Sequence, residues 1–70
     1  MGELAGVNHL KAIRAFEKAG FSVERQGKHV VMFNGSRTLI IPRHNPIKSF
    51  TLVGIVKSAG LTVEQFRKLL

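Results

Sequence analysis

The stretch FSVERQGKHVVMFNGSRTLII, residues 21–41, decides the fold. Residues 21–26 alternate between apolar and polar side chains, and residues 29–33 form a second run rich in β-branched and aromatic residues. The dipeptide Asn34-Gly35 is typical of a two-residue hairpin turn, and a third run over residues 38–41 ends before a proline. These patterns predict a three-stranded antiparallel meander.

Helical periodicity flanks the meander on both sides. Over residues 8–19 apolar side chains recur at helical spacing, with Asn8 as the expected N-cap and Gly20 as the left-handed residue that ends the helix. The same periodicity over residues 52–59 predicts a second helix that ends at Gly60.

The ends of the later helices are also marked. Ser49 or Thr51 is the expected cap of the second helix, and Thr62 with Gln65 forms a capping box for a short final helix. Gly54, inside the second helix, costs about 1 kcal/mol relative to Ala, so we expect it to mark close packing against another element. The order α-β-β-β-α-α predicts an α+β fold, a two-layer sandwich with both main helices on one face of the sheet.

Apolar residues lie on both faces of the predicted sheet. The second strand places Val30 and Met32 on one side and Val31 and Phe33 on the other. We hypothesise that the second face is covered by the last helix, by a copy of the chain through self-association, or by another protein.

Composition narrows the classes of partner. With 70 residues we expect one domain over residues 1–70, and 11 Lys and Arg against 4 Asp and Glu give a formal charge of +7. This imbalance favours a polyanion as partner, usually nucleic acid, while an acidic protein or no anionic partner are the alternatives.

Without cysteine there are no disulfides or thiolate metal ligands, which fits a reducing cytoplasm. The longest apolar run, residues 30–33, is far below the roughly 18 residues of a membrane span.

Histidine exchanges protons near neutral pH, and the chain has three, at positions 9, 29 and 44. His9 falls in the first turn of the first helix, where we expect a plain surface residue. His29 opens a strand after the tight turn Gly27-Lys28, which would hold the ring at the sheet rim beside a cation. RNA carries its own nucleophile in the 2′-hydroxyl, so its cleavage needs a base but no metal or cofactor. His29 is therefore either such a base or an ordinary exposed strand residue.

Four short segments together indicate a protein family by their order and spacing. They are KAGF (18–21), QGKH (26–29), IPRH (41–44) and TLVGIVKSAGLTVEQF (51–66). Together they resemble the HicA (YcfA-like) toxin family, and the resemblance covers almost the whole chain. It implies a fold like that of double-stranded-RNA-binding domains and a metal-independent mRNA interferase activity. It also implies messenger RNA as substrate and a HicB-type antitoxin as protein partner.

The resemblance also implies a catalytic residue. The family's Gly-Ser-His turn supplies its catalytic histidine, and the matching position here is His29, with Gly27 as the structural turn residue. Lys28 stands where serine is usual. It either holds the scissile phosphate or marks a member with altered or lost activity.

Three further residues are candidates for RNA binding. Arg43 and His44 follow the third strand, where they contact phosphate or assist proton transfer, or else are solvated loop residues. Lys48 precedes the second helix, whose free N–H groups and positive dipole end favour phosphate. Its alternative is a merely solvated lysine.

Three functions therefore compete. The first is a toxin ribonuclease that uses His29 as general base, the second is a non-catalytic RNA-binding module, and the third is a protein-docking domain. His29 behind its glycine turn separates them, because the second and third functions leave it without a purpose.

Overall fold

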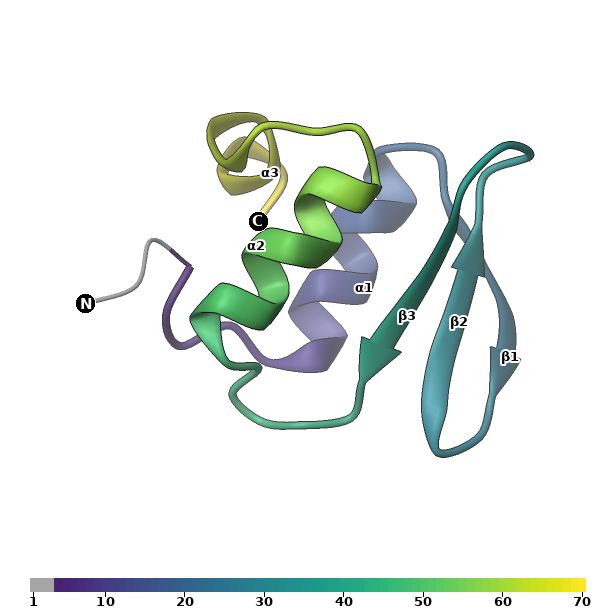
Figure 1. Cartoon of the computed structure of the whole chain (residues 1–70), viewed down its shortest axis with the longest axis horizontal. Coiled ribbons are helices and arrows are strands. Elements are labelled where there is room, and N and C mark those ends of the chain that lie inside the picture. Colours follow the sequence, from purple (N-terminus) through teal and green to yellow (C-terminus); the bar gives the residue numbers. More distant parts are fainter. Residues whose placement is uncertain (1–3) are drawn as a thin grey trace.

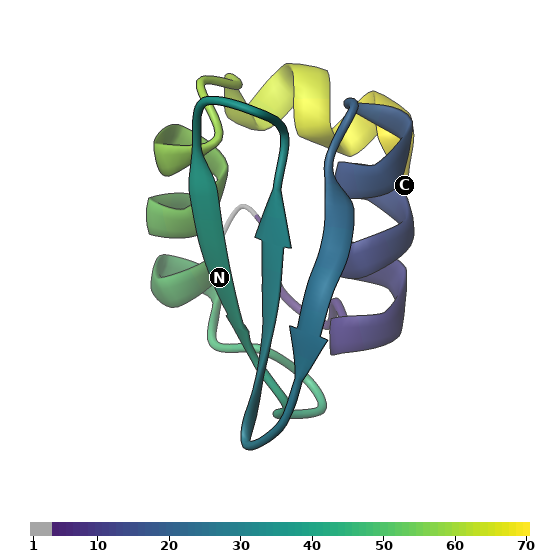
Figure 2. The same cartoon turned by 90° about the vertical axis from the view of Figure 1, so that its right-hand side faces the viewer.

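A computed structural model of the protein describes residues 4–70. All three helices lie on one face of the sheet (Figure 1), and Figure 2 looks onto the open face, with the helices behind the strands. The predicted α+β two-layer sandwich and its element order are confirmed. The elements are α1 (His9–Lys18), β1 (Ser22–Gln26), β2 (His29–Phe33), β3 (Thr38–Pro42), α2 (Ser49–Ser58) and α3 (Val63–Leu69).

The sheet has the order β1-β2-β3, and both strand pairs are antiparallel. Its inner face carries the cross-strand pairs Val30–Ile41 and Met32–Leu39, and all four side chains are buried. Because side chains alternate along a strand, the residues between them point to the open face. The inner face therefore contributes the buried core residues of the sheet, and the open face carries the side chains that do not pack in the core.

Phe66 fixes the position of α3. Its ring packs on Phe16 of α1 with centroids 4.8 Å apart, and both rings are fully buried. This contact keeps α3 in the helix layer, so the prediction that the last helix covers the second sheet face is wrong. Val31 and Phe33 stay half-buried there, and Ile40 is 58% exposed. Covering by a second copy or by another protein stays a hypothesis.

Two of the three predicted N-terminal helix caps are present, and Gly20 and Gly60 after α1 and α2 have the expected positive φ. The Asn8 side chain accepts a hydrogen bond from the Lys11 N–H at 2.8 Å, and the capping box of Thr62 and Gln65 is complete. The N-cap of α2 is Lys48, without a side-chain hydrogen bond, so the predicted cap by Ser49 or Thr51 is wrong. Ser49 already belongs to the helix, and its hydroxyl accepts a hydrogen bond from the Leu4 N–H at 3.3 Å. The first turn of α2 thus lacks a side-chain cap.

The hairpin between β2 and β3 has the predicted two-residue turn, placed one residue later along the chain. Four residues, 34–37, separate the paired residues Phe33 and Thr38. The Asn34 side-chain oxygen accepts hydrogen bonds from the N–H groups of Ser36 and Arg37 at 2.9 and 2.6 Å. The Asn34 N–H donates to the Arg37 carbonyl at 3.2 Å and Gly35 has a φ of 98°, so the two turn residues are Gly35 and Ser36 instead of the predicted Asn34 and Gly35.

Gly54 also differs from its prediction. It is exposed, and a Cβ placed on it would meet no atom within 4 Å, so the expected close packing is absent. The physical reason is rotation around the helix axis, because Leu52 and Val56 face the core and leave Gly54 on the outer side.

None of the helices within residues 4–70 is long and apolar enough to cross a membrane.

Candidate active site

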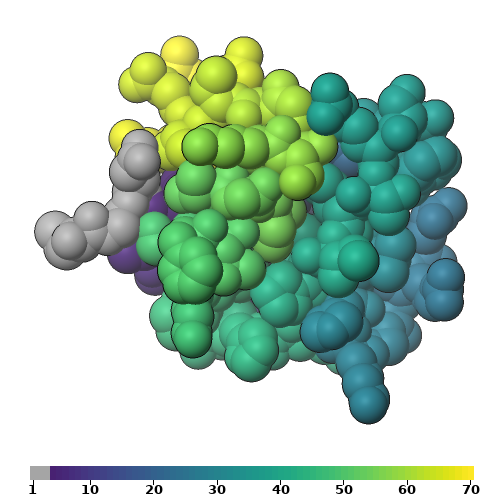
Figure 3. Space-filling model, in the orientation of Figure 1, coloured from purple at the N-terminus to yellow at the C-terminus, as the bar shows by residue number. Residues whose placement is uncertain are grey.

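The candidate residues gather at one end of the sheet, here called the rim. There β1 ends, β2 begins and β3 ends, and the chain passes on to the start of α2 (Figures 1 and 2). The segment that joins β1 to β2 projects from the body of the molecule at this end (Figure 3). The rim therefore collects five candidates from distant parts of the chain: Lys28, His29, Arg43, His44 and Lys48.

A tight turn sets the position of His29. The Gly27 N–H donates a hydrogen bond to the His29 carbonyl at 3.1 Å, which leaves Lys28 exposed at the tip. Gly27 lies in the turn as expected, but its φ is not positive, and a Cβ at this position would meet no other atom within 4 Å. Another residue could therefore replace Gly27 without straining the backbone of this turn.

The imidazole of His29 faces solvent on the open side of the sheet. Val30 and Met32 of β2 are buried, so His29 shares the opposite face with Val31 and Phe33. The cross-strand partner of His29 is Pro42, the last residue of β3. His29 is exposed and all helices lie behind the sheet, so a polymer has room to approach this face.

Arg43 reaches across the rim to β1. Its guanidinium donates a hydrogen bond to Oε1 of Gln26 at 3.4 Å. Gln26 is paired with the inward-facing Val30, whereas His29 belongs to the open face. Arg43 and His29 therefore flank the rim from its two sides.

His44 and Lys48 share a pocket of about 350 Å³ beside the rim. Pro42, the cross-strand partner of His29, also lines this pocket, which makes the two places neighbours. The uncapped start of α2 lies at Lys48, and free N–H groups at a helix N-terminus attract anions. The pocket thus combines an imidazole, an ammonium group and a helix N-terminus.

His9 anchors the loop that carries His44. Oδ1 of Asn45 lies 2.8 Å from Nδ1 of His9 and accepts a hydrogen bond from the His9 N–H at 3.0 Å. The Ile47 N–H donates to the Val7 carbonyl at 2.8 Å, and the Asn45–Pro46 peptide bond is cis. His9 is therefore not the plain surface residue we expected. The bond joins residues 36 positions apart, so no local pattern could reveal it.

Arg25 is a rim cation that the sequence did not reveal. Simple alternation from Phe21 through Val23 would send Arg25 inward, but the register shifts between Val23 and Arg25. Such a bulge turns the following side chain to the other face. Arg25 pairs with Val31 on the open face, and His29 is its diagonal neighbour at about 7–8 Å.

The candidate side chains do not bind one another. Among residues 4–70, the side chains of Lys28 and Lys48 form no hydrogen bond or ion pair, and none of the five candidate side chains bonds to another. No group of three His, Asp or Glu side chains within this part of the chain is placed to hold a metal ion. The rim therefore presents exposed imidazoles and cations, of which Arg43 alone has a side-chain hydrogen bond within residues 4–70, to Gln26.

Comparison with known families gives one match. The model of a family described as HicA toxin of bacterial toxin–antitoxin systems matches residues 11–61, which include Lys28, His29, Arg43, His44 and Lys48. Comparisons with curated proteins and with solved structures give no match.

Proposed function

Because this chain belongs to the HicA toxin family of bacterial toxin–antitoxin systems, we propose that it acts by cleaving messenger RNA, with His29 as the general base. The observation that carries this proposal is the exposed imidazole on an open sheet face, with cations on both sides of it. Family membership implies an antitoxin partner. Its HicB type, and a cytoplasmic place of action, belong to the proposal.

The proposed reaction uses the RNA's own hydroxyl as nucleophile. His29 accepts the proton of the 2′-hydroxyl while that oxygen attacks the neighbouring phosphorus. The bond from phosphorus to the 5′-oxygen breaks, and the leaving oxygen takes a proton from a general acid, for which His44 is the candidate. The products are a 2′,3′-cyclic phosphate and a free 5′-hydroxyl, so atoms and charge balance without a redox step.

The cations of the rim supply charge stabilisation. Negative charge accumulates on the phosphate oxygens in the transition state, and fixed positive groups near them lower the barrier. Lys28 precedes His29 directly in the chain, and Arg25 lies diagonally across from it on the open face. Arg43, Lys48 and the start of α2 suit the neighbouring phosphates, since the RNA backbone continues past the cleaved bond.

Cleavage of RNA in the presence of a chelator tests this proposal. We expect the wild type to cut and His29→Ala to lose about 10²–10⁴-fold in rate, the usual contribution of one general base. The thermal unfolding midpoint and the RNA affinity of the variant should match the wild type, because His29 is exposed. Unchanged cutting by His29→Ala would contradict the assignment.

A non-catalytic RNA-binding module is the second candidate, and Lys28 in place of the family's usual serine favours it. It predicts binding that weakens steeply with salt and no cleavage by the wild type under the same conditions. The Lys28→Ser variant separates the two. Cleavage that appears only in this variant would assign the wild type to the binding class.

A further inference from the structure

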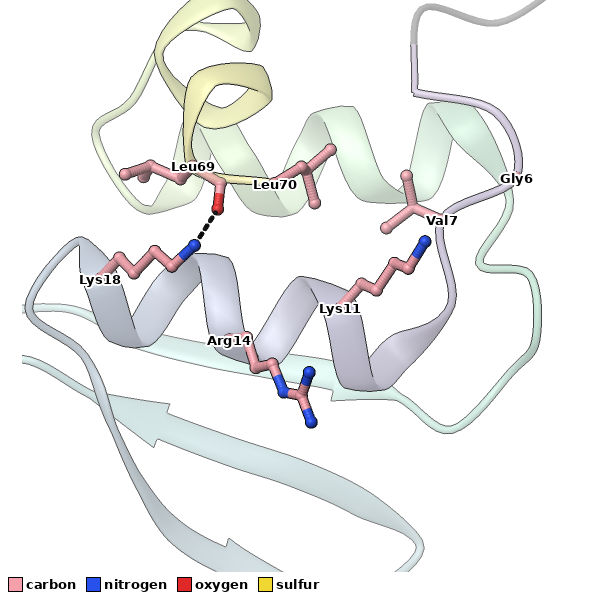
Figure 4. A pocket seen from close by; sticks show the side chains of 7 residues that line it. All are labelled: Gly6, Val7, Lys11, Arg14, Lys18, Leu69 and Leu70. Atoms are coloured by element: carbon pink, nitrogen blue, oxygen red, sulfur yellow. Dashed lines mark hydrogen bonds between the residues drawn. The ribbon is translucent and has the colours of Figure 1, made fainter.

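A groove of about 320 Å³ lies in the helix layer, between α1 and the end of α3 (Figure 4). We propose that this α1–α3 groove docks an acidic segment of a partner protein that also carries apolar side chains. None of its lining residues belongs to the rim, and the inference does not rest on RNA cleavage. Three basic residues of α1 line it: Lys11, Arg14 and Lys18.

Two of the three groove cations, Lys11 and Arg14, have side chains that form no hydrogen bond or ion pair with any of residues 4–70. The single acidic residue of α1, Glu17, is exposed and does not line the groove. The charged ends of Lys11 and Arg14 point in different directions (Figure 4), so each can contact a separate anionic group. Charge complementarity therefore points to an acidic occupant.

Lys18 closes one end of the groove. Its ammonium donates a hydrogen bond to the Leu69 carbonyl at 3.0 Å, drawn as a dashed line in Figure 4. A cation at the end of a helix satisfies a carbonyl that has no partner within the helix. Lys18 thus ties the last turn of α3 to α1, while Lys11 remains available to a ligand.

The apolar part of the lining selects a peptide over a nucleic acid. Leu70 is 45% exposed and Leu69 half-buried, and both line the groove together with Val7. A phosphate backbone would neutralise the cations and leave these aliphatic side chains in water. A peptide with carboxylates and a leucine or isoleucine between them can bind the basic side chains and cover the aliphatic side chains of the groove.

The spacing of the cations fits such a segment. Lys11 and Arg14 lie three residues apart, which is about 4.5 Å along the axis of α1. Carboxylates one helical turn apart on a partner helix have a similar spacing. Because the rim lies at the sheet and this groove among the helices, a short segment bound here leaves His29 accessible (Figure 1).

Fluorescence anisotropy with a labelled peptide of alternating Glu and Leu residues tests the proposal on the full chain. A peptide of the same length and charge, with Ser in place of Leu, measures the apolar contribution, and a labelled oligouridylate measures the nucleic-acid alternative. Lys11→Glu reverses one groove charge. Lys57→Glu on α2 makes the same change on an exposed helix surface outside the groove.

We expect Lys11→Glu to weaken binding of the Glu-Leu peptide by about tenfold and Lys57→Glu by less than about twofold, because only the first charge meets the ligand directly. The Ser peptide should bind more weakly than the Leu peptide, and Leu70→Ser should remove this difference. Circular dichroism melts check that the variants fold. Equal losses for the two lysine variants, equal binding of the two peptides, or an oligouridylate that needs Lys11 and displaces the peptide would overturn the proposal.

Discussion

The two faces of the sheet differ in what holds their residues in place. On the inner face, packing against the helix layer buries the cross-strand pairs Val30–Ile41 and Met32–Leu39, and close packing gives each side chain one position. On the open face and at the rim, His29 and its neighbours are set by a turn, a bulge and hydrogen-bonded loops. Stability and chemistry are therefore carried by different residues, and substitutions should separate them.

The largest effect is expected from the core. Phe66→Ala should lower the free energy of unfolding by about 3–5 kcal/mol, because it empties the space against Phe16. The matched control is Phe50→Ala on α2, whose ring is 77% exposed and whose loss should cost less than about 0.5 kcal/mol. Urea titration followed by circular dichroism measures both. Similar midpoints for the two variants would show that α3 is not held through Phe66.

The bulge in β1 offers a sharper test at the rim. Arg25→Ala should slow RNA cleavage by about tenfold, the equivalent of one charge-assisted hydrogen bond, and leave the unfolding midpoint unchanged. Arg14→Ala, which removes the same charge from α1, is the control and should slow cleavage by less than about twofold. An equal loss in both would mean that Arg25 acts only through net charge.

The smallest effect concerns the anchor of the rim loop. His9→Ala removes the side-chain contact with Asn45 and should cost about 1 kcal/mol of stability. Amide hydrogen exchange at Ile47, whose N–H binds the Val7 carbonyl, should become faster because the loop opens more often. His44→Ala in the same loop should leave this exchange unchanged. Identical protection of the Ile47 amide in both variants would show that His9 does not stabilise this loop.

Most of the fold was predictable because its signals are local. The β-rich run of β2, the Asn8 cap and the Thr62–Gln65 box each lie within a few residues, and each is present in the structure. The family resemblance added a role for His29, which local patterns alone left open between a base and an ordinary strand residue.

What escaped prediction depends on distant or rotational relationships. Arg25 reaches the open face only through a register shift against β2, and His9 matters only through a residue far along the chain. The close packing expected at Gly54 is absent because Gly54 lies on the side of α2 that faces away from the core. The cap of α2 was misplaced because the Ser49 hydroxyl binds the Leu4 N–H instead of an N–H of the helix start.

The bulge at Glu24 makes the effect of a deletion in β1 depend on which residue is lost. Deletion of Glu24 removes the extra residue and leaves a regular ladder in which Arg25 still pairs with Val31 and Gln26 with Val30. The guanidinium then stays on the open face, and Gln26 keeps the place from which it accepts the Arg43 hydrogen bond. Deletion of Val23 instead moves Glu24 opposite Met32 on the inner face, so this deletion should unfold the protein.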